Sequence, residues 1–282
     1  MGLFGRERIE GKTFDQIVKM RAAGLLVGET LELVREHVAP GVTTSELDAI
    51  AQAHIRRKGG VPSFLGYHGF SGTLCTSVND EIVHGIPGSR VLQEGDLLSV
   101  DCGAIVEGWH GDAAISVIVG GREAGRPEDL ALIDATEDSM WAGIAALAVG
   151  EPLYAVGAAV EDSITAAGRR HGREYGIVED YVGHGIGTEM HMDPQVPNYR
   201  VRDRGPTVRP GTTVAIEPMV TLGAEENRIL GDDWTVVTTD GSRAAHWENT
   251  VAVTEAGLWV LTALDGGKQR LEAAGVPYAP LS

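Results

Sequence analysis

Residues 94–101 read EGDLLSVD, and residues 210–217 read PGTTVAIE. In each stretch a glycine, Gly95 or Gly211, precedes a short apolar run, and an acid, Asp101 or Glu217, ends that run six positions after the glycine. A turn glycine followed by apolar residues is typical of a β-strand. Since both acids hold the same place in their stretches, the sequence predicts two related halves, each with a carboxylate at the end of a strand.

A pair of helices is expected ahead of each of these two strands. Residues 14–38 carry apolar side chains at helical spacing and end at Pro40-Gly41. A second helix follows Thr43, because Thr43 and Glu46 form a capping-box signature. The other half repeats this order, with helices expected at residues 128–148 and 152–170. Short apolar runs predict strands, so the fold class is α+β; the runs are residues 74–78, 82–87, 97–106 and 113–119.

The composition indicates an enzyme-sized globular chain and argues against nucleic acid and membrane as partners. The chain has 282 residues, of which 43% are hydrophobic and 22% charged, enough to bury a sizeable core. Its formal net charge of -17 repels phosphate backbones and anionic membranes. No apolar run reaches the roughly 20 residues that span a bilayer, and the first residues lack a signal-peptide core. Two cysteines are too few for a disulfide framework, so we expect a cytoplasmic protein.

Four acids stand in apolar, strand-like surroundings: Asp101, Asp112, Glu217 and Glu248. Each of them alone would be an ordinary strand-end acid in a salt bridge or a turn. Four carboxylates at one site could not all stay ionised, because like charges raise one another's pKa. Two divalent cations would balance them, and with His184 as a fifth ligand the donors suit manganese, iron, cobalt or zinc. Two such ions that share a hydroxide can hydrolyse peptides or phosphate esters.

Residues 183–194, GHGIGTEMHMDP, contain two histidines, His184 and His191, seven positions apart. That spacing would align them on a helix, but the three glycines around His184 disfavour a helix. On one straight strand, an odd spacing would point them to opposite sides. If both serve one site, the chain has to turn between them, and the two histidines can then have different roles.

Five segments, in order, resemble the successive motifs of the type I methionine aminopeptidases: YHGFSGTLCTSVNDEIVHGIP, SVDCGAIVEGWHGDAAISV, GHGIGTEMHMDPQVPNY, AIEPMV and HWENTV. The resemblance extends over about residues 14–262. It implies the pita-bread fold, in which two pseudo-symmetric α/β halves share a curved antiparallel sheet around a dinuclear metal site. We expect a lead segment (1–13), one catalytic domain (14–264, with halves 14–121 and 128–264) and a loosely held tail (265–282).

The resemblance implies a metal-dependent exopeptidase that removes the initiator methionine from nascent chains, prefers a small second residue and acts as a monomer. It implies that Asp112 and Glu248 bridge two ions of cobalt, manganese, iron or zinc. Asp101 then binds one ion, and His184 and Glu217 complete the other. Glu217 also accepts a proton from the attacking water.

The same resemblance assigns contacts with the substrate. His191 faces the scissile carbonyl and steadies the tetrahedral intermediate, and His84 contacts the scissile amide nitrogen or protonates the leaving amine. The methionine pocket is lined by Tyr67, Phe70, Cys75, Met190 and Trp234, with Phe64 and His68 near its rim. Met190 stands where relatives often have phenylalanine, and Met192 follows His191 where they often have an acid. The resemblance therefore does not predict the exact shape of the pocket.

Two other interpretations stay open. Prolidase and aminopeptidase P share the fold and the five ligands, but they carry a whole domain ahead of the catalytic one, whereas the catalytic helices here begin near residue 14. A pita-bread protein that only binds a partner would usually have lost ligands, and this chain keeps all five. The short stretch between Glu217 and Glu248 also lacks the helical insertion of the type II enzymes.

Overall fold

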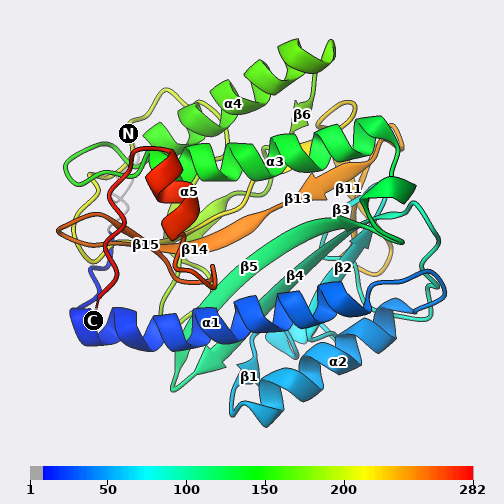
Figure 1. The fold of residues 1–282 in the computed structure, drawn as a ribbon, viewed down its shortest axis with the longest axis horizontal. Coiled ribbons are helices and arrows are strands. Elements are labelled where there is room, and N and C mark those ends of the chain that lie inside the picture. Colours follow the sequence, from blue (N-terminus) through cyan, green and yellow to red (C-terminus); the bar gives the residue numbers. More distant parts are fainter. Residues whose placement is uncertain (1–8, 282) are drawn as a thin grey trace, which may run out of the picture.

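A nine-stranded antiparallel sheet forms the centre of the fold, and both halves of the chain contribute to it (Figure 1). The structure is a computed structural model that describes residues 9–281. The strand order is β1-β4-β5-β14-β9-β7-β8, with β2 paired to β4 and β15 to β14. The halves meet where β5 pairs with β14. The strands are β1 (Val61–Pro62), β2 (Leu74–Val78), β4 (Leu97–Val106), β5 (Trp109–Ile118), β7 (Gly183–Gly185), β8 (Met192–Val196), β9 (Thr213–Ile216), β14 (Glu248–Val253) and β15 (Leu258–Val260).

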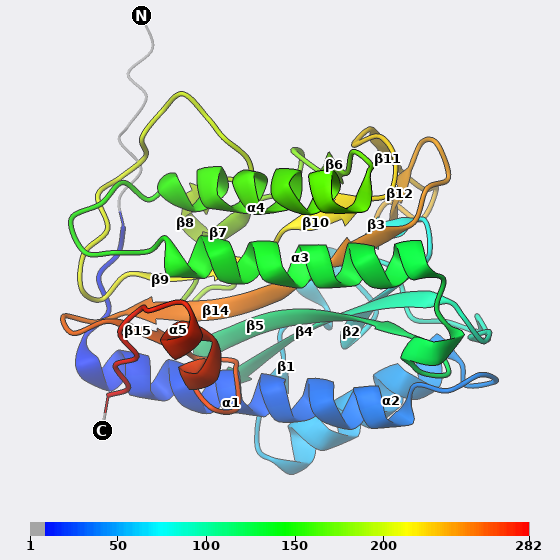
Figure 2. The same cartoon turned by 45° about the horizontal axis from the view of Figure 1, so that its top comes forward.

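The four long helices expected from the sequence are present within a few residues of their predicted limits: α1 (Phe14–His37), α2 (Thr44–Arg57), α3 (Pro127–Ala145) and α4 (Ala155–His171). The capping box of Thr43 and Glu46 begins α2 as predicted. One buried apolar cluster joins α1 and α2 to β2 and β4, and another joins α3 and α4 to β9 and β14. Figure 2 shows these two helix pairs along the two halves of the sheet.

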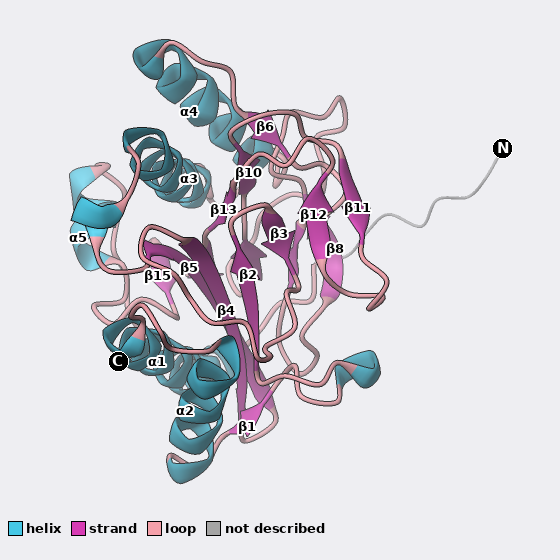
Figure 3. Ribbon diagram, turned by 90° about the vertical axis from the view of Figure 1, so that its right-hand side faces the viewer, coloured by secondary structure: helices cyan, strands magenta, loops and turns pink. Residues whose placement is uncertain are grey.

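Two small three-stranded sheets complete the fold. One has the order β13-β10-β6 and the other β11-β12-β3. In Figure 3, β3, β11 and β12 lie on the side of the main sheet opposite to α1 and α3. The strand expected at 82–87 is shorter than predicted, because the chain leaves the sheet after residue 83. The bounds are β3 (Glu81–Val83), β6 (Gly176–Ile177), β10 (Met219–Thr221), β11 (Asn227–Ile229), β12 (Val236–Thr238) and β13 (Ala244–His246).

The tail after residue 264 is packed, so the expectation that it is loosely held was wrong. It forms a short helix, α5 (Lys268–Ala273), whose Leu271 is 1% exposed and belongs to the core cluster of α3 and α4. Tyr278 bridges to Leu258 on β15. These few anchoring side chains outweigh the glycine- and alanine-rich composition. Of the expected lead segment 1–13, residues 1–8 lie outside the described residues, and the limits of the domain and of its halves stay a prediction.

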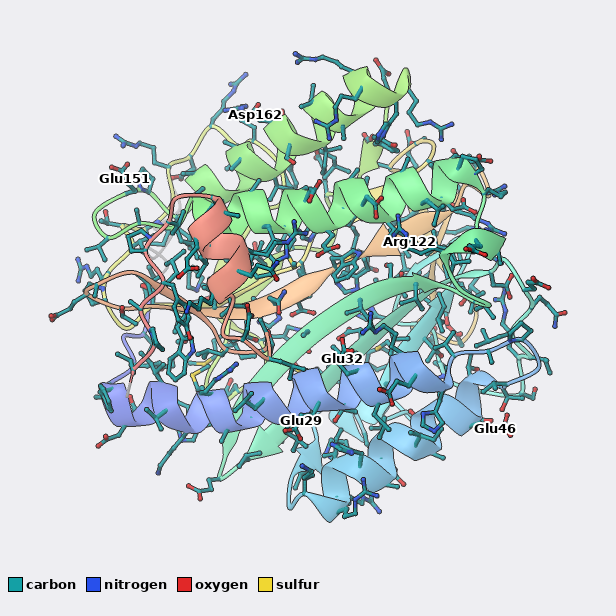
Figure 4. The ribbon with its side chains drawn as sticks, viewed as in Figure 1. Glu29, Glu32, Glu46, Arg122, Glu151 and Asp162 are labelled. Carbon is teal, nitrogen blue, oxygen red and sulfur yellow. The ribbon has the colours of Figure 1, made fainter. Side chains whose placement is uncertain are left out.

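Many of the acidic side chains point outward. Glu46, Glu151 and Asp162 are exposed at the surface (Figure 4). Acids of this kind are well solvated, in contrast to the buried acids described below. Within residues 9–281, the helices lack the combination of length and apolar character that crossing a membrane requires.

Candidate metal centre

Three of the predicted ligands lie together because of the register of the central strands. Asp101 on β4 and Glu248 on β14 both pair with Ala114 on β5, from opposite sides. Asp112 lies two residues before Ala114, so its side chain points to the same face of the sheet. Cys102, next to Asp101, packs on the opposite face in the cluster of α1 and α2. The three acids therefore share the face that the long helices leave uncovered.

The other two predicted ligands reach this face from the second half of the chain. Ala215 on β9 pairs with His184 on β7 and with Thr250 on β14. Glu217 lies two residues after Ala215, and Glu248 lies two residues before Thr250. In an antiparallel pair this register puts the two glutamates opposite each other. The structure thus brings all five predicted ligands to one face, although they come from five different strands or strand ends.

The donor atoms of Asp112, His184, Glu217 and Glu248 fall into two close groups that could each hold a metal ion, and Asp101 is in neither group. One donor atom each from Asp112, His184 and Glu248 lies within 4.8 Å of the others, and the same is true of Glu217, His246 and Glu248. Nε2 of His184 is 3.4 Å from a carboxylate oxygen of Glu217. Nδ1 of His184 lies 2.9 Å from the carbonyl oxygen of Gly185 and donates its hydrogen there, which leaves the lone pair of Nε2 free for a metal.

The acids are buried without enough partners. The four carboxylates are at most 9% exposed, and within the described part of the chain one oxygen each of Asp101, Asp112 and Glu248 has no hydrogen-bond partner. Burial raises the pKa of Asp101 to about 7. Burial, and then the neighbouring carboxylates, raise the pKa values of Asp112, Glu217 and Glu248 well above their ordinary range. Divalent cations would neutralise the repulsion between the carboxylates and would contact the oxygens that lack hydrogen bonds, so this donor set fits metal ions.

An apolar cavity of about 240 Å³ lies beside the acids. Phe64, Phe70, Cys75 and Met190 form a buried apolar cluster in its wall. Burial raises the pKa of the Cys75 thiol well above its ordinary value, so this side chain is an apolar wall and not a nucleophile. All five residues predicted for the methionine pocket line this cavity: Tyr67, Phe70, Cys75, Met190 and Trp234. His68, expected near the rim, is exposed to solvent.

The chain turns between His184 and His191, as a shared site requires. Strand β7 ends at Gly185, β8 begins at Met192, and the two imidazole rings lie 4.4 Å apart. A Cβ atom on Gly185 would stand 2.2 Å from the carbonyl oxygen of Asp193, so a glycine is needed for this turn.

The two histidines predicted to contact the substrate both line the cavity. Nδ1 of His191 is 2.9 Å from the hydroxyl of Tyr67. His84 follows β3 with a φ of 61°, which is uncommon for a residue other than glycine, and its ring stands 5.5 Å from that of Tyr181. Burial lowers the pKa of His84 to about 4 and also lowers the pKa of His191. Both rings are therefore neutral near pH 7, and each carries one N–H donor and one acceptor nitrogen.

The sequence reasoning missed several residues of this site. Five further residues line the cavity: Val83, Asp180, Tyr181, Val182 and Met219. His246, in the second group of donors, was also missed. His246 lies two positions before Glu248 in the segment HWENTV, but the two residues are on strands of different sheets, β13 and β14, so alternation along one strand did not predict its place in the site.

Comparisons with known proteins agree with this geometry. Residues 18–255 match the pattern of metallopeptidase family M24. Methionine aminopeptidase 1 of Mycobacterium tuberculosis is 50% identical over 261 residues, which cover 92% of this chain and 97% of that protein. The solved methionine aminopeptidase of Thermotoga maritima has a TM-score of 0.85 and 38% identity, and the match covers 91% of this chain and 100% of that chain. A prolidase from Pyrococcus furiosus shares the fold, with a TM-score of 0.67 at 19% identity; the match covers 89% of this chain but 65% of that chain.

Proposed function

Because this chain belongs to the methionine aminopeptidases of metallopeptidase family M24, we propose that its buried acids and His184 hold two divalent ions beside the N-terminal methionine of the substrate. The reaction is the hydrolytic removal of that methionine. The observation that carries the metal proposal is the group of four buried carboxylates. Three of them have an oxygen that forms no hydrogen bond with any group in residues 9–281. The proposed ligands are Asp101, Asp112, His184, Glu217 and Glu248.

In this proposal Asp112 and Glu248 would be shared between the two ions, Asp101 would bind one of them, and His184 and Glu217 would bind the other. The position of Glu248 in both groups of close donors supports its bridging role. Carboxylates with one imidazole suit cobalt, manganese, iron or zinc. Such ions, when bound, make water acidic and polarise a carbonyl group.

The protein's own side chains position the substrate and move protons. Glu217 accepts a proton from the attacking water and passes it toward the leaving amine. The Tyr67 hydroxyl donates to Nδ1 of His191, so Nε2 of His191 carries the hydrogen and donates it to the oxygen of the scissile carbonyl. This contact strengthens as negative charge develops on that oxygen. His84 contacts the scissile amide nitrogen from the other wall of the cavity.

The apolar cavity binds the methionine side chain. Its walls of aromatic rings and sulfur favour a thioether side chain, and their burial keeps water out. The free amino terminus of the substrate lies near Asp101, which limits cleavage to one residue. The second residue has to fit beside His84 and His191, which supports a preference for a small side chain at that position.

We also propose that residues 14–264 act as one catalytic domain, with halves at 14–121 and 128–264, and that the protein works as a monomer on nascent chains in the cytoplasm. The two cysteines, Cys75 and Cys102, are buried and free, as suits a reducing compartment.

The test is hydrolysis of Met-Gly-Met and of an Ala-Pro peptide, side by side, by protein loaded with cobalt or manganese. Release of methionine from Met-Gly-Met without comparable cleavage of the Ala-Pro peptide is expected. Preference for the Ala-Pro peptide would overturn the assignment in favour of a proline-specific peptidase.

A further inference from the structure

His246 is buried beside the proposed metal ligands, and one nitrogen of its ring, Nε2, has no hydrogen-bond partner within residues 9–281. His246 is the last residue of β13 and is 1% exposed. A buried imidazole nitrogen without a partner is unfavourable, so its retention calls for an explanation.

The backbone of His246 is held in place by the central sheet. Its N–H donates to the hydroxyl of Ser116 on β5 at 2.9 Å, and that hydroxyl donates to the carbonyl oxygen of His246, also at 2.9 Å. Ser99 on β4 lies 2.8 Å from the same hydroxyl. β13 also pairs with β10, where His246 stands opposite Met219. These contacts fix the position of the backbone of His246.

The free nitrogen faces two of the proposed metal ligands. Nε2 of His246 lies 4.0 Å from Oε2 of Glu217 and 4.0 Å from Oε2 of Glu248. This separation is too long for a hydrogen bond. Two donors that each bind one ion at about 2.1 Å can stand up to about 4.2 Å apart, so the spacing suits a shared ion. One donor from each of the three residues lies within 4.8 Å of the others.

We propose that His246 is a second imidazole ligand of the metal centre and binds, through Nε2, an ion that Glu217 and Glu248 also hold. The inference rests on the proposed metal centre and adds a sixth protein side chain to its five ligands. A second neutral nitrogen donor shifts the preference of the site toward cobalt, iron or zinc and away from manganese, which favours oxygen ligands.

The experiment counts coordinated histidines in the intact protein. We would load the metal-free protein with two equivalents of Co²⁺, label its histidines with ¹⁵N, and record the paramagnetically shifted imidazole signals by NMR. Two coordinated imidazoles are expected in the unsubstituted protein, and one in His246→Gln. His54→Gln is the matched control, because His54 is also buried and, within residues 9–281, its Nε2 has no hydrogen bond and lies 3.8 Å from a carboxylate oxygen of Glu29, but the residue is on α2. This variant is expected to keep both signals.

Calorimetric titration with Co²⁺ separates this inference from the metal proposal on which it rests. His246→Gln is expected to bind at least one of the ions about tenfold more weakly or worse, since even an outer partner of a ligand is worth about 10- to 100-fold. A single coordinated imidazole in the unsubstituted protein would overturn the role of His246 and leave the five-ligand centre intact. Failure of the unsubstituted protein to bind Co²⁺ would overturn the metal centre itself. The count in the unsubstituted protein does not depend on whether a variant folds.

Discussion

The hydroxyl of Tyr67 lies 2.9 Å from Nδ1 of His191. When the hydroxyl donates in this contact, as we propose, Nδ1 of His191 is the acceptor and the hydrogen of the ring lies on Nε2. The substrate carbonyl then meets a donor and not a lone pair. An apolar cavity wall would have needed no hydroxyl at this position, so Tyr67 does more than fill space.

Tyr67→Phe is therefore expected to lower kcat/KM for Met-Gly-Met by about tenfold, which corresponds to about 1.4 kcal/mol of lost transition-state stabilisation. Cobalt affinity should not change, since Tyr67 is not a proposed ligand. The matched control is Tyr175→Phe, because Tyr175 forms the same kind of contact with Nδ1 of His171 at 2.7 Å on the surface near α4. Equal kcat/KM values for the two variants would remove Tyr67 from the mechanism.

Glu217→Gln is expected to lower kcat by at least about a hundredfold, because the amide cannot accept a proton from water. The variant keeps the shape of the side chain and one oxygen donor. Turnover and bound metal should be measured on the same sample. The control is Glu151→Gln, at an exposed position (Figure 4). A Glu217→Gln enzyme with full metal content and a near-normal rate would show that another group accepts the proton.

The sequence predicted five ligands and five pocket residues that the structure brings to one region, but it did not predict His246, the other residues that line the cavity or the strand pairing that joins them. Alternation along a single strand is visible in the sequence, but it relates the residues of that strand alone, whereas Asp101 and Asp112 lie on two strands, β4 and β5. That Asp101 and Glu248 meet on either side of Ala114 depends on the register of strands far apart in the chain, which local sequence does not determine.

Two errors have the same origin. His246 lies on β13, in a small sheet separate from β14, so its approach to Glu217 follows from tertiary packing that no local pattern reveals. The tail was expected to be loose because its composition is rich in glycine and alanine. A few apolar side chains, Leu271 in the core cluster of α3 and α4 with Val276 and Tyr278 packed against it, outweigh that composition.

Metal removal is expected to make stability depend on pH. Without metal, burial raises the pKa of Asp101 from 3.8 to about 7, and Asp112, Glu217 and Glu248 are shifted in the same direction. The folded state then binds more protons than the unfolded chain, so its free energy of unfolding falls as pH rises through these values. Buried histidines act in the opposite sense, but only below their ordinary pKa of 6.5; that of His84, for example, is lowered to about 4.

Above about pH 6.5 the carboxylates therefore dominate the pH dependence of stability. The melting temperature of the metal-free protein should fall by about 3 °C per pH unit for each proton that the folded state binds in excess of the unfolded state. Differential scanning calorimetry in EDTA between about pH 7 and pH 8 measures this slope. Cobalt-loaded protein is the control, because its carboxylates are ionised in this range in both the folded and the unfolded state, and its melting temperature should stay nearly constant. Parallel slopes with and without metal would contradict the assignment of these acids as ligands.

Gly185→Ala tests whether the turn between the two histidines is needed. The added Cβ atom would stand 2.2 Å from the carbonyl oxygen of Asp193, on the neighbouring strand β8, and this backbone atom cannot move without moving His191. We expect the variant to lose about 2–3 kcal/mol of unfolding free energy, as clashes in a packed interior do. It should also bind cobalt more weakly, because His184 precedes the substituted residue. Gly231→Ala is the control, since no atom lies within 4 Å of the Cβ atom added there. Urea unfolding of both variants, with calorimetric titration of cobalt, measures the two effects, and a Gly185→Ala protein as stable as Gly231→Ala would show that the strands separate at little cost.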